Sequence, residues 1–199
     1  MKKFLWPLAI FTVGVLALCS CTTMGETTES PITTSLAGVI AENITPASTP
    51  IENAAFTTKY DEALKNRTTN LELATKTING TVVNPDEVFS FNETIGKPTL
   101  ARGYKIAKIF VKGKEEKGIG GGICQVSSTL YNAADFGGLE IVERHAHSKR
   151  VYYVDEGRDA AASYGGIDLK FRNTLSLPVK IVANAVDGEL TVTLEAILS

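Results

Sequence analysis

The residues best suited to chemistry lie near the middle of the chain, where Cys124 follows a glycine-rich run. Four of the five residues from 118 to 122 are glycine. Glycine loses much backbone entropy on ordering and buries no side chain, so the run predicts a loop. Apolar residues then recur at helical spacing from Val126 to Ala134, which predicts a helix beginning near Cys124. Unpaired N–H groups at such a helix start favour a thiolate and can bind an oxyanion.

The only two histidines of the chain, His145 and His147, follow this helix. If the backbone there is extended, Glu143 and both histidines point to one side. A later stretch, 167–172, alternates apolar and polar residues and places Asp168 on its polar side. A thiol, an imidazole and a carboxylate are the parts of a cysteine–histidine catalyst. The sequence therefore predicts acyl transfer by Cys124, with His147 or His145 as base and Asp168 orienting the imidazole.

The same residue types also occur in metal sites, in phosphate-binding loops and in protein cores. Cys124, Glu143 and the two histidines are all possible zinc ligands, but no CxxC or HExxH spacing accompanies them, so no metal is predicted. The glycine run lacks the lysine and hydroxyl residue of a phosphate-binding loop, and no cofactor is predicted. A free cysteine is also often a small buried apolar residue. On that alternative the chain is a non-catalytic binding module.

The first residues resemble an export signal. Two lysines precede an apolar run over residues 4–18, which is too short for a bilayer span. The run ends in Leu18-Cys19-Ser20-Cys21, which resembles a bacterial lipobox with cleavage after Ser20 and a diacylglycerol group on Cys21. We interpret residues 1–20 as a lipoprotein signal peptide, the alternative being a plain signal peptide. The protein would then be extracytoplasmic, anchored to a bacterial membrane through Cys21, with Cys124 as its only free thiol.

Residues 21–55 are rich in Thr, Ser and Pro and contain no Lys or Arg. Such a segment buries too little apolar surface to offset its chain entropy, so we interpret it as a flexible tether. Residues 56–199 are then the folded domain. The whole chain of 199 residues has a formal net charge of −2 and no basic stripe, which argues against nucleic acid as a partner. The sequence leaves the oligomeric state open.

The remaining pattern predicts an α+β domain. In it, an N-terminal helix over 68–78 and the Cys-bearing helix pack on a mainly antiparallel sheet, with the cysteine before the histidine as in cysteine peptidases. Loop-like composition covers 92–103, and the charged residues 112–117 are typical of a solvent-exposed turn. An Asp187-Gly188 pair predicts a hairpin near the end. The predicted strands are 81–83, 87–91, 104–111, 139–142, 151–154, 167–172, 179–183 and 190–196.

Several of these blocks together resemble the VanW domain, a family named for its occurrence in some vancomycin-resistance gene clusters. The resemblance covers roughly residues 68–194 and is most specific in the glycine–cysteine block. The blocks are Phe89-Ser90-Phe91-Asn92 with Gly96, the block from Gly120 to Ala134, Glu143-Arg144-His145-Ala146-His147-Ser148, Gly157-Arg158-Asp159-Ala160 and Asp168-Leu169-Lys170-Phe171-Arg172-Asn173.

The resemblance implies a cell-envelope protein with L,D-transpeptidase activity, which forms 3-3 cross-links between peptidoglycan stem peptides. Cys124 would attack the carbonyl before the terminal D-alanine, and an amine of a neighbouring stem would resolve the thioester. Arg144 or Arg158 would clamp the substrate carboxylate, and amides around Cys124 and Gln125 would form the oxyanion hole. The substrate-binding candidates are Gly121, Gly122, Gln125, Arg144, Ser148, Arg158 and Asp159.

One feature departs from the usual L,D-transpeptidases, in which the histidine precedes the cysteine. The order here is closer to that of cysteine peptidases of the cell wall. With water in place of the amine, the same residues would make an endopeptidase or carboxypeptidase. The sequence therefore predicts the reaction class and leaves the acyl acceptor open.

Overall fold

The computed structural model describes residues 48–111 and 113–198. The described residues belong to one compact unit of the chain, Ile44–Ser199. The predicted signal peptide, the predicted lipidation site Cys21 and residues 21–47 of the predicted tether lie outside the described residues. Within the described part of the chain, no helix combines the length and apolar character that a membrane span requires.

A four-stranded antiparallel sheet forms one side of the domain, in the order β1-β9-β8-β2. Strands β8 and β9, the last two in the sequence, form the predicted hairpin around Asp187 and Gly188, and both of these residues have positive φ. Alternate residues of these strands, from Val179 in β8 and from Leu190 in β9, are buried on one face. The strands are β1 (Ser48–Lys59), β2 (Val82–Val83), β8 (Val179–Val186) and β9 (Glu189–Ile197).

Strand β1 begins at Ser48, ahead of residue 56, where the sequence indicated that the domain starts. It pairs with β9 along both of its ends, with an irregularity between Pro50 and Ala55. Ala54 is fully buried against the core. The Thr- and Pro-rich composition indicated a flexible tether here. An edge strand can have this composition, because it needs few large apolar residues and tolerates proline.

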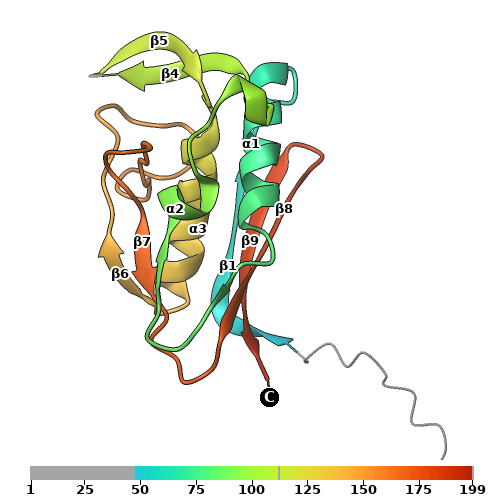
Figure 1. Ribbon diagram of the computed structural model, residues 1–199, viewed down its shortest axis with the longest axis vertical. Helices are drawn as coiled ribbons and strands as arrows, with labels where there is room; N and C mark the ends of the chain where they lie inside the picture. Colours follow the sequence, from blue (N-terminus) through green and yellow to red (C-terminus); the bar gives the residue numbers. More distant parts are fainter. Residues whose placement is uncertain (1–47, 112, 199) are drawn as a thin grey trace, which may run out of the picture. The chain divides into compact units, whose positions relative to one another are not determined.

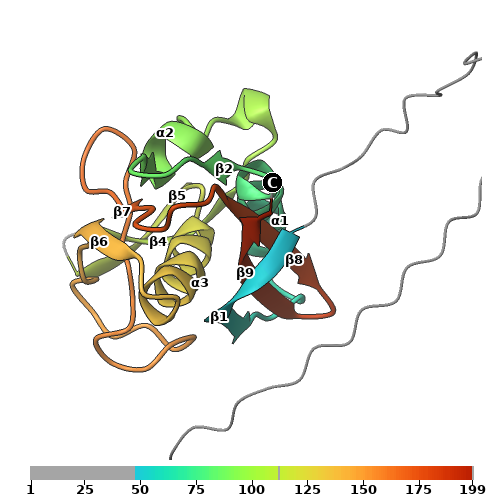
Figure 2. The ribbon, with the colours of Figure 1, turned by 90° about the horizontal axis from the view of Figure 1, so that it is seen from below.

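Two helices, α1 (Lys65–Ile78) and α3 (Ile123–Phe136), cover the inner face of this sheet. A second antiparallel sheet, in the order β3-β7-β6, packs on the other side of α3. Figures 1 and 2 show α3 between the two sheets, so the domain has a sheet–helix–sheet arrangement. The α+β class with mainly antiparallel sheets is therefore confirmed. The strands of the second sheet are β3 (Val88–Ser90), β6 (Glu140–Glu143) and β7 (Lys170–Arg172).

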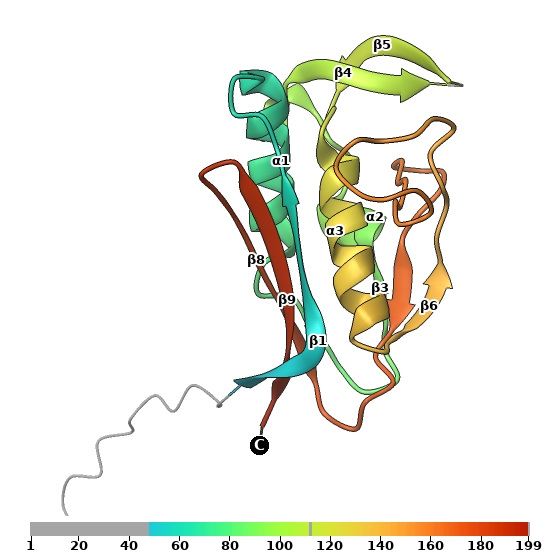
Figure 3. The ribbon, with the colours of Figure 1, turned by 180° about the vertical axis from the view of Figure 1, so that it is seen from behind.

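A two-stranded hairpin, β4 (Ile106–Val111) and β5 (Lys114–Ile119), stands at the end of the domain where α3 begins (Figure 3). The charged residues predicted as a turn are thus largely a strand. An exposed antiparallel ribbon favours opposite charges across its strands, and Lys108 pairs with Glu115 at 2.6 Å. Two short helices precede the hairpin in the predicted loop, α2 (Phe91–Ile95) and the 3-10 helix η1 (Leu100–Arg102). Residues 151–154, predicted as a strand, form bends instead.

Candidate active site

Cys124 is the second residue of α3, as the glycine run and the apolar periodicity predicted. The residue before the helix, Gly122, has a φ of 114°, and a Cβ there would lie 2.9 Å from the Cγ of Arg67. A Cβ on Gly121 would lie 2.2 Å from the carbonyl oxygen of Lys108. Because these approaches leave no room for side chains, the glycines let α1 and β4 close around the cysteine.

The backbone amides near Cys124 are not equivalent. Ile123 donates to the carbonyl of Gly120 and Gln125 donates to that of Gly122, each at 3.1 Å. Among the described residues, no acceptor pairs with the N–H of Cys124. The amide of Cys124 itself is therefore free to bind a developing oxyanion, whereas the amide of Gln125, included in the sequence prediction, is occupied.

His147 is the histidine that the structure brings to Cys124. Its Nδ1 lies 2.5 Å from the Oδ2 of Asp159, and its backbone N–H donates to the same oxygen at 2.6 Å. The thiol of Cys124 is close enough to the imidazole to raise the pKa of His147, while its Sγ lies 3.3 Å from the carbonyl oxygen of Ala162. Since Nδ1 faces Asp159, the nitrogen available to the thiol is Nε2. Cys124, His147 and Asp159 thus form a thiol–imidazole–carboxylate chain.

Asp159 is fixed in turn by Arg144. The Nε of Arg144 donates to the carbonyl oxygen of Asp159 at 2.6 Å, and its Nη2 donates to Oδ1 at 3.0 Å. Each carboxylate oxygen therefore has a separate donor, because His147 uses Oδ2 and Arg144 uses Oδ1. This arrangement leaves the carboxylate little freedom to rotate and holds the imidazole toward Cys124.

The segment 158–162, hereafter the ladder segment, runs alongside α3 and carries Asp159. Three α3 side chains at four-residue spacing bind alternate carbonyl oxygens of this segment. Four helical residues rise about 6 Å and two extended residues about 6.6 Å, so the two registers match. The three pairs are Cys124 Sγ with Ala162 O at 3.3 Å, Ser128 Oγ with Ala160 O at 3.3 Å, and Asn132 Nδ2 with Arg158 O at 2.7 Å.

The electrostatics of the chain favour a protonated imidazole. Burial acts to lower the pKa of His147, but the hydrogen bond and charge of Cys124, followed by those of Asp159, outweigh it and raise that pKa above its usual value. Burial acts to raise the pKa of Asp159, and the hydrogen bonds from His147 and the charge of Arg144 outweigh it, so that pKa is lowered. These directions suit an imidazolium with an ionised carboxylate behind it.

His145 belongs to a different cluster. Its Nε2 lies 3.0 Å from the Oε1 of Glu143, whose Oε2 lies 2.8 Å from the Nζ of Lys170. The hydrogen bond from Lys170, then those from the backbone of Asp168 and from His145, lower the pKa of Glu143 to about 2. This cluster joins β6 to β7 and makes no contact with the thiol among the described residues.

Asp168, the carboxylate predicted to orient the imidazole, has other partners. Its oxygens accept hydrogen bonds from the hydroxyl of Ser90 at 2.6 Å and the backbone N–H of Asn92 at 2.9 Å. Asp168 lies just before β7 and caps the start of α2. The carboxylate beside His147 is therefore that of Asp159. Alternation along a strand predicted Asp168 on the polar side and Ile167 on the buried side, and this prediction is wrong, since Asp168 is 4% exposed and Ile167 is 38% exposed.

Four predicted substrate-binding residues serve the fold through their side chains or lie outside the site. Gln125 is fully buried, accepts from Arg67 at 2.7 Å and donates to Thr58 and Lys59 at 2.9 Å each. Arg158 binds Asn132 and Asp135, and Arg144 binds the ladder segment. Ser148 is exposed and does not line the cleft described next.

A cleft of about 860 Å³ opens beside Cys124 and His147. Residues of the β4–β5 hairpin and residues 150–153 of the loop that follows His147 both line it. Gly121 and Gly122 line it, as predicted for substrate contacts. Its apolar lining includes Ile95, Pro98, Ile106, Ile109, Ile119, Tyr152 and Tyr164.

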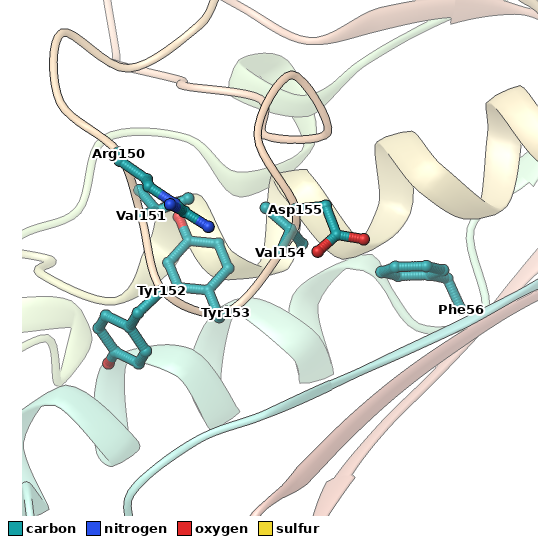
Figure 4. Close-up of a pocket in the computed structure, with 7 residues that line it drawn as sticks. All are labelled: Phe56, Arg150, Val151, Tyr152, Tyr153, Val154 and Asp155. Atoms are coloured by element: carbon teal, nitrogen blue, oxygen red, sulfur yellow. The ribbon is translucent and has the colours of Figure 1, made fainter.

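A second hollow of about 530 Å³ shares residues 150–153 with this cleft and reaches Phe56 of β1. Figure 4 shows the two tyrosines of the loop, with the hydroxyl of Tyr153 directed toward Arg150 and that of Tyr152 directed away from it. Burial, followed by the charge of Cys124, raises the pKa of Tyr153, so its phenol stays protonated beside the thiol. In residues 48–111 and 113–198, no three His, Cys, Asp or Glu side chains are grouped to hold a metal ion.

Sequence reasoning missed the position of Asp159 next to the imidazole, and it missed Arg67 and Tyr153 altogether. A usable indication for Asp159 was the pattern Cys124, Ser128, Asn132 on one helical face, since polar side chains four residues apart need acceptors if buried. The sequence held no comparable indication for Arg67, because its position depends on how α1 packs against α3.

Comparison with known proteins bears on the same region. A family model described as "VanW like protein" matches residues 66–195. The chain is 47% identical over 139 residues to "Uncharacterized protein YoaR" of Bacillus subtilis, an alignment covering 70% of this chain and 46% of that protein. It is 36% identical over 143 residues to "Vancomycin B-type resistance protein VanW" of Enterococcus faecalis, covering 69% of this chain and 51% of that protein. The chain thus spans about half the length of these relatives. No solved structure matches it.

Proposed function

Because the chain belongs to the VanW-like family, we propose that it acts at the bacterial cell envelope as a cysteine-dependent acyltransferase on peptidoglycan stem peptides. The proposed reaction is L,D-transpeptidation, which forms 3-3 cross-links. The proposal includes a lipid anchor on Cys21 and an extracytoplasmic location. One observation carries it, the chain Cys124–His147–Asp159 at the start of α3 with the N–H of Cys124 free.

In the first half of the proposed reaction, the thiolate of Cys124 attacks the carbonyl carbon that precedes the terminal residue of a stem peptide. A C–S bond forms, and the carbonyl π electrons move to the oxygen, which accepts a hydrogen bond from the N–H of Cys124. When the oxyanion collapses, the C–N bond breaks. The imidazolium of His147 gives its proton to the departing amine, which leaves a thioester and a neutral imidazole.

In the second half, a side-chain amine of a neighbouring stem attacks the thioester. Neutral His147 takes the proton that this amine loses as the new amide forms. The C–S bond breaks, its electrons return to sulfur, and the thiolate–imidazolium pair is restored. Asp159 stabilises the imidazolium in both halves and fixes which ring nitrogen faces the sulfur. Water as acceptor would give a peptidase instead, which is the alternative closer to the Cys-then-His order.

A second candidate function rests on the contact between Sγ of Cys124 and the carbonyl oxygen of Ala162 at 3.3 Å. A neutral thiol can donate there, as Ser128 does at the next position of the ladder segment. In that state Cys124 helps to hold the ladder segment, and the domain is a non-catalytic module that binds muropeptides or a protein partner. The two functions differ in where the thiol proton resides, on sulfur or on His147.

The test uses the purified full chain and tetrapeptide muropeptides analysed by mass spectrometry. We expect an acyl group on the peptide that contains Cys124 and the appearance of 3-3 linked dimers. Cys124→Ser should fold and give neither, a loss of at least about 10³-fold. In parallel, Cys124 of the wild type should be alkylated at neutral pH far faster than free cysteine. An inert Cys124, or an undiminished product yield from Cys124→Ser, would favour the non-catalytic module.

A further inference from the structure

Arg67 in the first turn of α1 lies against the start of α3. Its Nη2 donates to the Oε1 of Gln125 at 2.7 Å, directly beside Cys124 in the chain. A Cβ on Gly122 would lie only 2.9 Å from the Cγ of Arg67. The side chain therefore crosses the glycine turn that leads into Cys124, and Arg67 lines the same cleft as the thiol and His147.

The other half of this guanidinium group lacks a partner. Nη1 of Arg67 is buried and has no hydrogen-bond partner among the described residues. A buried charged donor without an acceptor is costly, and such groups in native proteins commonly await a ligand or a water molecule. Two aromatic rings offset part of this cost, since the Cζ of Arg67 lies 5.7 Å from the ring centre of Tyr152 and 5.9 Å from that of Tyr153.

The other cations near the site hold the fold, lie outside the cleft or lie on the surface. Arg144 holds Asp159. Arg158 holds Asn132 and Asp135 with its Nε and Nη1, and its buried Nη2 also lacks a partner among the described residues, but Arg158 does not line the cleft. Of the remaining cations that line the cleft, Lys108 pairs with Glu115 at 2.6 Å, and Lys65 and Arg150 are exposed. Arg67 is the cation that combines a place in the cleft, a fixed guanidinium and an unpaired buried donor.

We infer that Arg67 binds the free C-terminal carboxylate of the residue that leaves when Cys124 attacks, so that the site accepts peptides ending one residue after the scissile bond. The inference rests on the proposed acyl transfer. In such a peptide the carboxyl carbon lies within about 4 Å of the attacked carbonyl carbon. A guanidinium held beside Gln125 is thus near enough to reach the carboxylate, and a charged partner matches the unused donor at Nη1.

Tyr152 is the side chain that a bound carboxylate would displace. It is 71% exposed, so little packing holds its ring over the guanidinium. Tyr153, by contrast, is partly buried, so more packing holds its ring in place. Exchange of the Tyr152 ring for a carboxylate replaces a weak cation–π contact with a charge-assisted hydrogen bond and opens the way from the cleft to Nη1.

The experiment compares two stem peptides that differ only at the C-terminus, one a free acid and the other an amide, with the full chain. Release of the terminal residue and acylation of Cys124 are followed by mass spectrometry. The wild type should react about 10- to 100-fold faster with the acid, as expected when one charge-assisted hydrogen bond is lost. Arg67→Met should lower the rate with the acid to that with the amide, so that the preference for the acid is lost.

Arg150→Met is the matched control, because Arg150 lines the same cleft but is exposed. It should keep the preference for the acid. Equal rates with acid and amide in the wild type, or loss of the preference in Arg150→Met alone, would overturn the assignment to Arg67 while the acyl transfer stands. If Cys124 reacts with neither peptide, the proposed function itself fails. If Arg67→Met does not fold, the rates of the wild type with the acid and the amide still test whether the site binds a free carboxylate.

Discussion

Two histidine–carboxylate pairs lie side by side in the chain, His147 with Asp159 and His145 with Glu143. Both join an imidazole nitrogen to a carboxylate oxygen within 3.0 Å. The surroundings differ. The side chain of His147 is 10% exposed and lines the same cleft as the thiol, whereas that of His145 is 42% exposed and does not line it.

The carboxylates differ in their third partner. Arg144 orients Asp159 from the ladder segment, while Lys170 of β7 neutralises Glu143. Arg144 binds Oδ1 of Asp159 and leaves Oδ2 for the imidazole of His147. Lys170 of β7 binds Glu143 of β6, so this carboxylate connects two strands. Residue types and spacing thus define a set of possible catalytic residues. The burial of each histidine and the cation bound to its carboxylate decide which member of the set can act.

The largest effect that separates the two pairs is expected from their histidines. His147→Gln should lower the acylation rate of Cys124 by about 10²- to 10⁴-fold, because it removes the proton acceptor and donor of both reaction halves. His145→Gln should change the rate by less than about threefold, since its imidazole contacts Glu143. Single-turnover acylation followed by mass spectrometry measures both. A larger loss in His145→Gln would assign the base to the other pair.

The carboxylates should differ less, and mainly in pH dependence. Asp159→Asn should lower the acylation rate by about 10²-fold, whereas Glu143→Gln should leave it close to the wild type. The hydrogen bond and charge of Asp159 help to raise the pKa of His147, so their loss should lower that pKa. Because the imidazolium protonates the leaving amine, activity falls as pH rises through this pKa. The alkaline limb of the pH–rate profile should therefore move to lower pH in Asp159→Asn and stay in place in Glu143→Gln.

A direct measurement checks the cause. Nuclear magnetic resonance titration of the His147 ring in Cys124→Ser should also give a lower pKa, because the contact with Cys124 contributes more to the upward shift than Asp159 does. The ring of His145 provides a reference signal in the same spectrum. An unchanged His147 titration in both variants would mean that neither neighbour stabilises the imidazolium, and the two pairs would no longer differ in the proposed way.

Much of the frame of this site could be predicted from the sequence. The glycine run, the start of α3, the β8–β9 hairpin and the α+β class all follow from local rules of backbone entropy and periodicity. Cysteine and histidine are rare in this chain, and this rarity indicated that Cys124 and one of the histidines share a site. These features depend on a few consecutive residues, which is the range over which propensity and alternation act.

The residues that complete the site could not be predicted in the same way. Asp159 lies beside His147 because Ser128 and Asn132 hold both of its neighbours against α3, and that register exists only once the segment has docked. Asp168 is buried and does not lie on the polar side of a strand, because it accepts a hydrogen bond at the start of α2, an element that the sequence did not indicate. Arg67 reaches Cys124 through the packing of two helices. Each case depends on a tertiary contact between distant segments.

The smallest effect concerns the stability that the His145–Glu143 pair gives to β6 and β7. The pKa of Glu143 is lowered to about 2 in the folded protein, chiefly by the hydrogen bond from Lys170. A depressed carboxyl pKa stabilises the fold above the unfolded value of about 4.3 and ceases to do so as pH falls through the folded value. Glu143→Gln keeps an acceptor for the backbone N–H of Asp168 but loses the charge that pairs with Lys170.

We therefore expect Glu143→Gln to lower the free energy of unfolding by less than about 1 kcal/mol at pH 7, because the pair is partly exposed. Denaturant unfolding of the two proteins should give curves that converge as pH is lowered from about 4.5 toward 2. Acylation of Cys124 should stay near the wild-type rate throughout the range in which both proteins are folded. A stability difference that persists at pH 2 would assign the loss to packing, and a lost acylation rate would tie this pair to the site after all.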